Sequence, residues 1–478
     1  MKFDFPLCPL GEANIVNQNV NQIPFVDTYG KLPPLWNRRV AFFANLLALF
    51  YGNEAQTEAL RIEVGEIDSY SARLIPIMNL LFHDSHNLLV LERDPDISLC
   101  NYLKNDLGLS LPHLEVLPHQ QYVEIGRQIS NAQDLKPASW IDQIKKHNIN
   151  WIDGYVTDET ITGIAFHSGC QTIASTEASR DGNNKFKLHQ FLIEAGLPAF
   201  ETMLAESPLD IQNCAQELFR RGYRSAVVRA QIGASGIGMM RLKDLSNLET
   251  LPEIPSYFFF EGACLVQGWL EPGVKEIVKI RSPSTQLFLN DSTVYAYDMT
   301  EQILSNESIH QGNISPPPYM NDWPGLREET MRQAEQVGCW LHQTGYRGTA
   351  SIDWLAIEYA GRKELEVIVC EINARVTGAT YPSLVARHFL PNGAWLLRNL
   401  RLRIPITTEE LLNLFDQPGH LFYPDRKAGI IPLNLNFGSD NRVHKGQFLC
   451  LAETPDACQK YLELAEKDLP VQWDSDRD

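Results

Sequence analysis

Two strongly apolar segments late in the chain, residues 349–357 and 364–372, constrain the fold more than any other feature. In the first segment apolar residues alternate with Ser351 and Asp353, which predicts a strand with one buried and one polar face. If residues 361–363 form the turn between the two strands, the numbers of opposed residues sum to about 724. The two segments therefore predict an antiparallel hairpin of defined register.

This register brings oxygen-bearing side chains together on one patch. Asp353 lies opposite Glu371, and Asn373 lies one pair further along the same face. Two carboxylates and an amide oxygen are hard ligands that suit Mg²⁺, and Arg375 would project beside them, where it could bind a phosphate oxygen. The alternative is a solvated polar face at a sheet edge. We favour the metal site, because the flanking residues are strongly apolar and buried like charges repel each other.

A run of small residues between two further strand candidates is the second chemical feature. Residues 226–229 and 238–242 are typical of strands, and the intervening residues 230–237 are rich in Gly, Ala and Ser. Such a loop lets backbone N–H groups approach an anion closely. It is not a Walker A loop, because no Lys-Ser/Thr pair follows, and a dinucleotide fingerprint would precede a helix rather than a strand. Taken alone, the loop is better explained as a flexible hairpin turn.

Elsewhere the chain alternates strand and helix patterns. Apolar runs at residues 88–91, 114–117 and 151–156 are each followed by helix-compatible sequence, which predicts a parallel sheet with helices on its faces. Residues 183–195 predict a helix with a polar start, and a long helix with one buried face lies within residues 325–346. At about 150 residues per domain, the chain length of 478 residues predicts about three domains.

The composition argues against several classes of partner. Forty-one basic against fifty-nine acidic residues give a net charge of −18, which disfavours sequence-independent binding of nucleic acid. The nine cysteines contain no C-x-x-C pair, so they predict neither a disulfide framework nor a zinc site, and they suit a reducing cytosol. Residues 40–50 form the longest aliphatic run, too short to span a bilayer, and residues 1–4 lack the order of a signal peptide. We expect a soluble cytoplasmic protein with no nucleic-acid and no membrane partner. His83 and His86 have metal-like spacing but fit a polar loop better.

Four features in their order along the chain resemble the ATP-grasp superfamily: a helix-borne Lys185, a strand ending in Arg229, the small-residue loop and the late carboxylate hairpin. The resemblance spans about residues 150–390. The preceding domain resembles the pre-ATP-grasp domain of pheganomycin-type peptide ligases, and the stretch EINARVTGATYP at residues 371–382 is particularly similar to that group. The resemblance implies a mixed α/β and α+β fold, with a Rossmann-like pre-ATP-grasp domain followed by a two-lobed ATP-grasp module. The expected divisions are an N-terminal arm (1–38), the pre-ATP-grasp domain (39–175), the N-terminal lobe (176–267), the C-terminal lobe (268–400) and a C-terminal region of unassigned role (401–478).

The resemblance also implies roles for individual residues. Lys185 would reach the nucleotide phosphates, and Arg229 would bind the α- and β-phosphates where the family usually has a second lysine. Arg229 and Arg375 are the candidate catalytic residues. The other candidates are the phosphate loop (Gly233, Ser235, Gly236 and Gly238), the adenine hinge (Gln267, Trp269 and Leu270), the ribose ligand (Glu276), the metal ligands (Asp353, Glu371 and Asn373) and the acceptor pocket (His310 and Asn313).

Some of these residues also have a structural explanation. Without the resemblance, Lys185 would be better explained as an exposed helix lysine. Glu276 could equally form a surface pair with Lys275, and His310 and Asn313 could equally shape a loop.

The implied activity is ATP-dependent ligation of a carboxylate to an amine. The acid would become an acyl phosphate, the amine would displace phosphate, and ADP would be released. Mg²⁺ would be the metal, with Mn²⁺ able to substitute, and the acceptor would be an amino acid or short peptide among small-molecule carboxylate and amine substrates. An oligomer is compatible with the sequence. An ATP-dependent small-molecule kinase and a non-catalytic nucleotide-binding sensor are the alternatives, since both would use the same nucleotide clamp.

Overall fold

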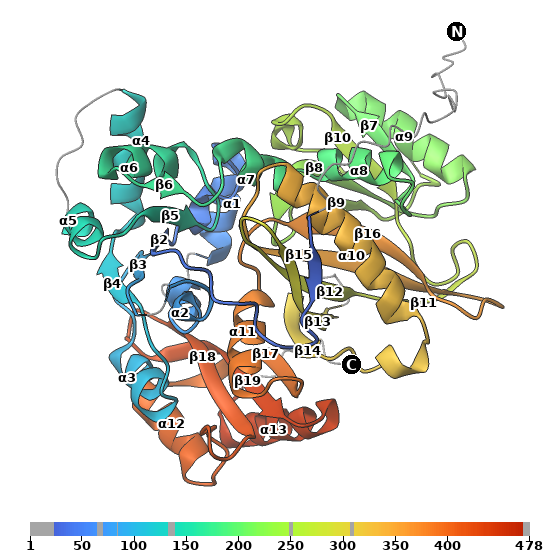
Figure 1. Cartoon of the computed structure of the whole chain (residues 1–478). Helices are drawn as coiled ribbons and strands as arrows, with labels where there is room; N and C mark the ends of the chain where they lie inside the picture. Colours follow the sequence, from blue (N-terminus) through green and yellow to red (C-terminus); the bar gives the residue numbers. More distant parts are fainter. Residues whose placement is uncertain are drawn as a thin grey trace.

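The computed structural model describes residues 23–64, 70–83, 85–131, 139–247, 252–305 and 310–471. Within these residues the chain forms three sheets, of five, four and ten strands. Each sheet draws on a different part of the sequence, and Figure 1 shows them as three groups of arrows with their covering helices.

The five-stranded sheet is parallel, with the strand order β4-β3-β2-β5-β6. Its two central apolar strands, β2 and β3, are buried along their whole length, because helices cover both faces of the sheet (upper left in Figure 1). This parallel order agrees with the alternation of strand and helix patterns in the sequence. The elements are β2 (Val40–Phe43), α1 (Glu54–Val64), α2 (Met78–Leu81), β3 (Leu88–Leu91), α3 (Ile97–Asn101), β4 (His113–Val116), α4 (His119–Ser130), α5 (Ser139–Lys146), β5 (Trp151–Gly154), α6 (Glu159–Ser168) and β6 (Gln171–Thr172), with short 3-10 helices at Leu46–Ala48 and Tyr70–Leu74 and a π-helical turn at Tyr102–Asp106.

The four-stranded sheet is antiparallel, with the strand order β7-β10-β8-β9. It contains the predicted hairpin, since β8 and β9 pair with Ala226 opposite Leu242 and Arg229 opposite Met239. The hairpin prediction is thus confirmed. The elements of this lobe are α7 (Thr176–Gly182), α8 (Lys185–Glu194), β7 (Thr202–Ala205), α9 (Pro208–Arg220), β8 (Ala226–Ala234), β9 (Ile237–Leu242), a 3-10 helix at Ser256–Phe259 and β10 (Cys264–Gly268).

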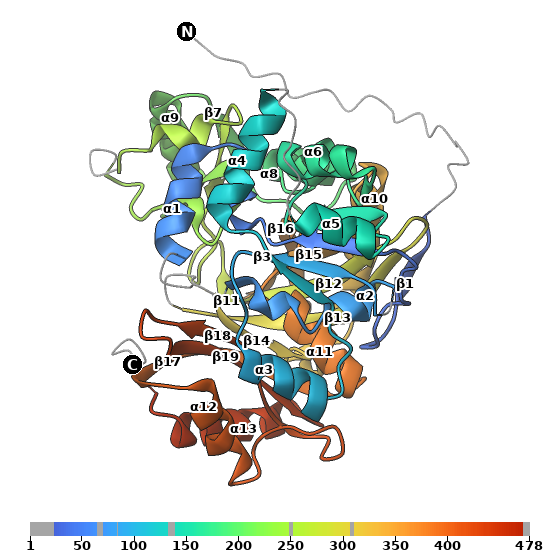
Figure 2. The same cartoon turned by 90° about the vertical axis from the view of Figure 1, so that its left-hand side faces the viewer.

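The ten-stranded sheet crosses the middle of the molecule and extends into the C-terminal region (Figure 2). The path β11-β15-β12-β13-β14-β17-β19-β18 is joined by β16, which pairs with β15, and by β1, which pairs with β13. Its elements are β1 (Phe25–Asp27), β11 (Ile277–Arg281), β12 (Pro283–Leu289), β13 (Val294–Leu304), β14 (His310–Ser315), a 3-10 helix at Met320–Asp322, α10 (Leu326–Gln343), β15 (Gly348–Tyr359), β16 (Glu366–Asn373), α11 (Thr380–Phe389), β17 (Ala394–Ile406), α12 (Thr408–Asp416), β18 (Gly429–Phe437), β19 (Val443–Ala452) and α13 (Pro455–Asp468).

Two of the expected divisions of the chain, the C-terminal region and the N-terminal arm, contribute strands to this sheet. The division between residues 400 and 401 falls inside β17, so the C-terminal region continues the same sheet. The end of the N-terminal arm also joins it, because Phe25 pairs with Val294 through β1 and β13. Residues 1–22 of the arm lie outside the described residues.

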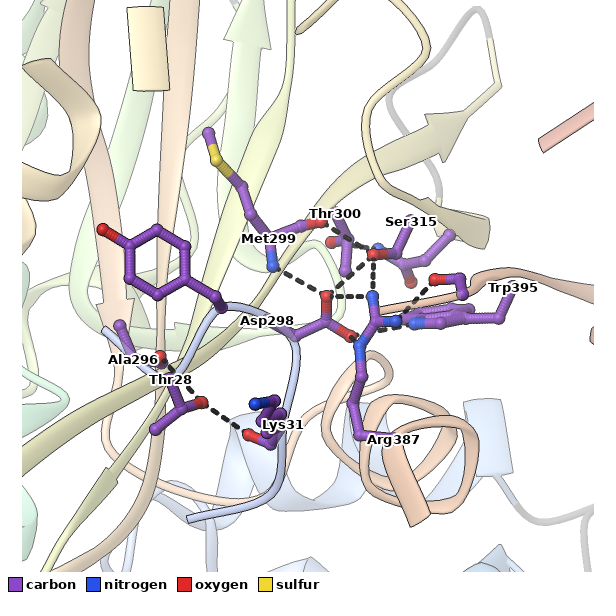
Figure 3. Close-up of polar contacts among 12 residues, drawn as sticks. Thr28, Lys31, Ala296, Asp298, Met299, Thr300, Ser315, Arg387 and Trp395 are labelled. Carbon is purple, nitrogen blue, oxygen red and sulfur yellow. Dashed lines mark hydrogen bonds and ion pairs between the residues drawn. The ribbon is translucent and has the colours of Figure 1, made fainter. Parts of the chain in front are cut away.

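A buried ion pair fixes α11 against three strands of this sheet (Figure 3). Arg387 on α11 donates from Nε and Nη2 to the Asp298 carboxylate on β13, at 3.0 and 2.7 Å. The guanidinium also donates to Ser315 on β14, and Trp395 on β17 donates to the same carboxylate. The two side chains are only 4% and 2% exposed, and these bonds offset the cost of removing both charges from water. The pair therefore positions the segment that precedes α11.

In the described part of the chain, no helix has both the length and the apolar character that crossing a membrane would require. The cysteines described there are free thiols.

Candidate active site

The β15–β16 hairpin carries the two carboxylates in the predicted register. Asp353 is paired with Glu371, and Ser351 with Asn373, so the register prediction is confirmed. The Asn373 side chain donates from Nδ2 to Asp353 Oδ2 at 3.0 Å, which shows that both side chains lie on one face. The hairpin thus brings two carboxylates and an amide to one patch.

Three cationic side chains from different elements converge on this patch. Lys185 Nζ, at the start of α8, lies 3.4 Å from Glu371 Oε2. Arg229 on β8 donates to the same oxygen, and Arg375 donates to Asn373 Oδ1. Three cations thus face two carboxylates, which leaves an excess of positive charge suited to an anion.

The charges shift the ionisation of the two carboxyl groups in opposite directions. Burial alone would raise the pKa of Glu371, but Lys185, Arg229 and Arg375 together lower this pKa to about 2. Burial, and then the neighbouring Glu371, raise the pKa of Asp353 to about 7. Burial also lowers the pKa of Lys185, while Glu371 acts against that decrease. Glu371 is thus already stabilised as a carboxylate by its cationic neighbours, whereas Asp353 is the carboxyl group whose charged form a bound metal ion would stabilise.

The donor set fits a magnesium ion better than a transition metal. Asp353 and Glu371 carry carboxylate oxygens and Asn373 carries an amide oxygen, which are hard ligands of the kind Mg²⁺ shares with water and phosphate. Arg375 donates to that amide oxygen and would have to release it to a metal ion. In the described part of the chain, no three His, Cys, Asp or Glu side chains gather as a metal centre. A metal here would thus need further oxygen ligands beyond the two carboxylates.

Two consecutive asparagines position the cations; the sequence identified this stretch only as the polar start of a helix and not as part of the site. Asn184 caps α8 by accepting from the backbone N–H groups of Phe186 and Lys187, which makes Lys185 the first residue of the helix. Asn183 clamps Ala374, donating to its carbonyl and accepting from its N–H, each at 3.2 Å. The Asn-Asn pair before a helix is the sequence signal that could have drawn attention to them.

Arg229 is held deep between the two lobes. Its side chain is 9% exposed, and its Nη1 donates to the Cys370 carbonyl on β16 at 3.1 Å. Among the described residues its buried Nε has no hydrogen-bond partner. A buried guanidinium N–H without an acceptor is costly, so this atom is available for an anionic ligand.

The predicted phosphate loop is a tight two-residue turn. Ser235 and Gly236 both have positive φ, at 52° and 80°, and connect β8 directly to β9. Gly233 is required by packing, since a Cβ there would lie 2.6 Å from the Ile237 carbonyl oxygen. Gln56 on α1 donates to the Ile232 carbonyl at 3.1 Å, so the parallel domain anchors the hairpin.

The hinge candidates lie at the end of β10. Leu265 is the partner of Arg229, and Gln267 lies two residues further, on the same face of the small sheet. Gln267 is buried and donates to Thr202 Oγ1 at 2.9 Å. The backbone N–H of Trp269 donates to the Ser225 carbonyl. Leu270 is half-buried and packs against two apolar clusters.

Glu276 lies apart from the carboxylates. It precedes β11, where Ile277 pairs with Tyr359, and its carbonyl accepts from Ala360. Tyr359 is six residues along β15 from Asp353, which corresponds to roughly 20 Å. The alternative expected from the sequence is a surface ion pair between Glu276 and Lys275. In the structure Lys275 instead forms its ion pair with Glu201, at 3.0 Å.

His310 and Asn313 contact each other on β14. His310 Nε2 lies 2.6 Å from Asn313 Oδ1, and Asn313 also donates to Thr300. A Cβ built on Gly378 would lie 3.1 Å from His310 Cε1, so the histidine borders the segment that follows Arg375. Burial lowers the pKa of His310, which favours the neutral ring. The rings of His83 and His86, the two histidines with metal-like spacing, stack on each other with their centres 6.1 Å apart.

A curated relative matches part of the chain. It is the [butirosin acyl-carrier protein]–L-glutamate ligase of Niallia circulans, 26% identical over 203 residues, which are 42% of this chain and 45% of that protein. The match therefore spans less than half of the relative's length. No protein-family model matches the chain.

Solved structures match most of the chain. They include a biotin carboxylase–β-γ-ATP complex from Campylobacter jejuni (TM-score 0.53, 12% identity, 91% of this chain and 92% of that chain). An N5-carboxyaminoimidazole synthase from Aspergillus clavatus, in complex with ADP and 5-aminoimidazole ribonucleotide, gives a TM-score of 0.50 at 14% identity, covering 91% and 100%. Both kinds of enzyme are ATP-grasp enzymes. The chain has the ATP-grasp fold. The fold that the sequence resemblance implied is thereby confirmed, and identities this low establish the fold alone.

Proposed function

We propose that this ATP-grasp chain is an ATP-dependent carboxylate–amine ligase that releases ADP and phosphate. The observation that carries the proposal is the convergence of Lys185, Arg229 and Arg375 on the Asp353–Glu371 pair. Such a cluster combines cations for a polyphosphate with oxygen ligands for its metal ion. We further propose that the parallel five-stranded sheet is the Rossmann-like pre-ATP-grasp domain.

The nucleotide would lie between the two lobes. Lys185 and Arg229 would exchange part of their contact with Glu371 for phosphate oxygens, and the unpartnered Arg229 Nε would gain an acceptor. The β8–β9 turn would cover the phosphates, with Gln267 and Trp269 at the adenine end. Glu276 fits a ribose contact only if the nucleotide extends away from the carboxylates.

The chain's own residues would serve the chemistry in three ways. A bound Mg²⁺, held by Asp353, Glu371 and Asn373, would neutralise phosphate charge. Arg375 would stabilise the oxygens of the transferring phosphoryl group, because it lies beside Asn373 on the same patch. The hairpin anchored by Gln56 would limit the access of water to a reactive intermediate.

The proposed reaction has two steps. The substrate carboxylate attacks the γ-phosphorus, the bond to the bridging oxygen breaks, and ADP leaves an acyl phosphate behind. The amine then attacks the acyl carbon, phosphate leaves, and the amine loses a proton as the amide forms. Activation is needed because a free carboxylate would have to expel oxide.

The relative supports an amino-acid substrate. By its name, the Niallia circulans protein joins L-glutamate to an acyl-carrier protein. For this chain we propose an amino acid or short peptide as the acceptor.

The test is to incubate the purified chain with ATP, Mg²⁺ and pools of amino acids and short peptides. Substrate-dependent ADP release, new amide masses and trapping of a hydroxamate by hydroxylamine are the expected results. AMP and pyrophosphate would contradict the acyl phosphate. A stable phosphorylated product without an amide would instead identify a kinase, and ATP binding without turnover would identify a sensor.

A further inference from the structure

The polar face of the carboxylate hairpin continues across the large sheet into the C-terminal region. Asp353 on β15 is opposite Ser284 on β12, which is opposite Thr300 on β13. Asn313 on β14 donates to Thr300, so its side chain lies on this face as well. Directly opposed residues in neighbouring strands share a face, so one row of polar side chains leaves the carboxylates and reaches β14.

The row then crosses the last three strands. Asn313 is opposite Leu397 on β17, and Asn399 lies two residues further along that strand. Asn399 is opposite Gln447 on β19, and Gln447 is opposite Asn434 on β18. Gln447 donates to Asn399 Oδ1 at 2.8 Å, which confirms that these amides face the same side.

At the far end of the row, two buried side-chain amides each have one atom that lacks a hydrogen-bond partner among the described residues. Asn434 and Asn436 lie on the same face of β18 and are only 2% and 4% exposed. Within the residues that the structure describes, Asn434 Oδ1 and Asn436 Nδ2 form no hydrogen bond. One buried acceptor and one buried donor, two residues apart on a strand, are costly unless a ligand or water satisfies them.

The parallel domain and α11 border this face. Tyr381 on α11 donates to Gln447 Oε1 at 2.7 Å, and the Arg73 guanidinium lies 5.0 Å from the centre of the Tyr381 ring. Arg73 belongs to the 3-10 helix Tyr70–Leu74, which contacts β18. Its charge also acts on His310, which borders the segment after Arg375. A cation and a set of amides thus face the same region.

We propose that this row is the binding site for an extended acceptor substrate, a short peptide that carries a carboxylate. Neighbouring strands are about 4.8 Å apart, so the three steps from Asn313 to Asn434 cover about 14 Å. A single amino acid cannot reach across that distance, whereas about four extended residues can. Peptide N–H and C=O groups match Asn434 Oδ1 and Asn436 Nδ2, and Arg73 matches a carboxylate. The C-terminal region then serves to measure the length of the acceptor.

This inference rests on the proposed function, so its test separates the two. Randomised pools of L-amino acids, dipeptides, tripeptides and tetrapeptides are compared at equal concentration by the rate of ADP formation. The parent chain is expected to turn over the tetrapeptide pool at least tenfold faster than the amino-acid pool. In the N434L/N436L double variant this ratio should fall toward one, while the KM for Mg²⁺-ATP is retained.

Leucine is close in shape to asparagine and removes the unpartnered polar atoms, so the double variant should unfold at the same or a higher temperature. The control is Asn413→Leu, which changes an exposed asparagine of α12 in the same region and should keep the length preference. A second variant, Arg73→Met, should weaken the preference for peptides with a free carboxylate over their C-terminal amides.

Three outcomes of the comparison between pools would overturn the site. They are the absence of length preference in the parent chain, an equal loss of rate for all pools in the double variant, and an unchanged ratio in that variant, which would mean that the row holds only water. Failure of every pool to release ADP would also overturn it if Mg²⁺-ATP still binds. Failure accompanied by loss of Mg²⁺-ATP binding would count against the proposed function itself.

Discussion

At the scale of single residues, Arg229 shows how one side chain can connect the two lobes. It starts on β8 of the small sheet, donates to the Cys370 carbonyl and contacts Glu371 on the large sheet. A lysine has a single ammonium group, whereas the guanidinium fork can hold the carbonyl and the carboxylate and still offer Nε to a phosphate. The arginine at this position is therefore consistent with a nucleotide-binding role.

We predict that Arg229→Ala raises the Kd for ATP by a factor of about 10 to 100, the usual value of a charge-assisted hydrogen bond. Isothermal titration with ATP measures the change. Arg229→Lys should fall between the parent and alanine, because it keeps the charge but loses the fork. Arg127→Ala, which removes an exposed arginine that contacts Glu124, is the matched control. Equal affinity in the parent and Arg229→Ala would refute the assignment.

At the scale of elements, the β15–β16 hairpin concentrates the candidate chemistry on two paired strands. Replacing Asp353 by Asn or Glu371 by Gln preserves the shape of each side chain but removes a charge. We predict that either change reduces Mg²⁺-dependent turnover at least 100-fold while the chain stays folded, since two charged metal ligands become one. Turnover measured against Mg²⁺ concentration, together with circular dichroism, tests this.

The control for the hairpin is Glu366→Gln. Glu366 lies at the other end of β16 and contacts the exposed Arg362 at 3.7 Å, so its charge should not affect magnesium. If Glu371→Gln and Glu366→Gln have the same magnesium dependence as the parent, the carboxylate pair is only a polar face of the sheet.

At the scale of the whole molecule, the Arg387–Asp298 pair determines how α11 sits on the large sheet. Arg387→Ala would leave the Asp298 carboxylate buried without its cation, and removing one partner of a buried pair typically costs about 3–5 kcal/mol. We predict a large decrease in the temperature of unfolding, measured by calorimetry. Arg332→Ala, which breaks an exposed pair with Glu329, should change stability by less than about 1 kcal/mol. Similar small effects for both variants would show that α11 is held by packing alone.

The sequence by itself determined the features that depend on neighbours along the chain. The period of two in residues 349–357 and the turn at 361–363 predicted that Asp353 faces Glu371, and the pairing has that register. The polar start likewise predicted a helix over residues 183–195, and α8 occupies Lys185–Glu194 within that range. Strand periodicity, turn length and helix caps are local properties, so the amino-acid order is sufficient to specify them.

Only the tertiary structure decided which distant segments meet. Asn183 clamps Ala374 across 191 residues, and no local pattern connects the two. The sequence left residues 401–478 without a role, yet β18 and β19 extend the sheet that carries the carboxylates. The order of strands in a sheet follows from the packing of the whole chain, since each strand alone would fit several neighbours. The same packing, rather than the sequence pattern, placed Lys185, Arg229 and Arg375 on one patch.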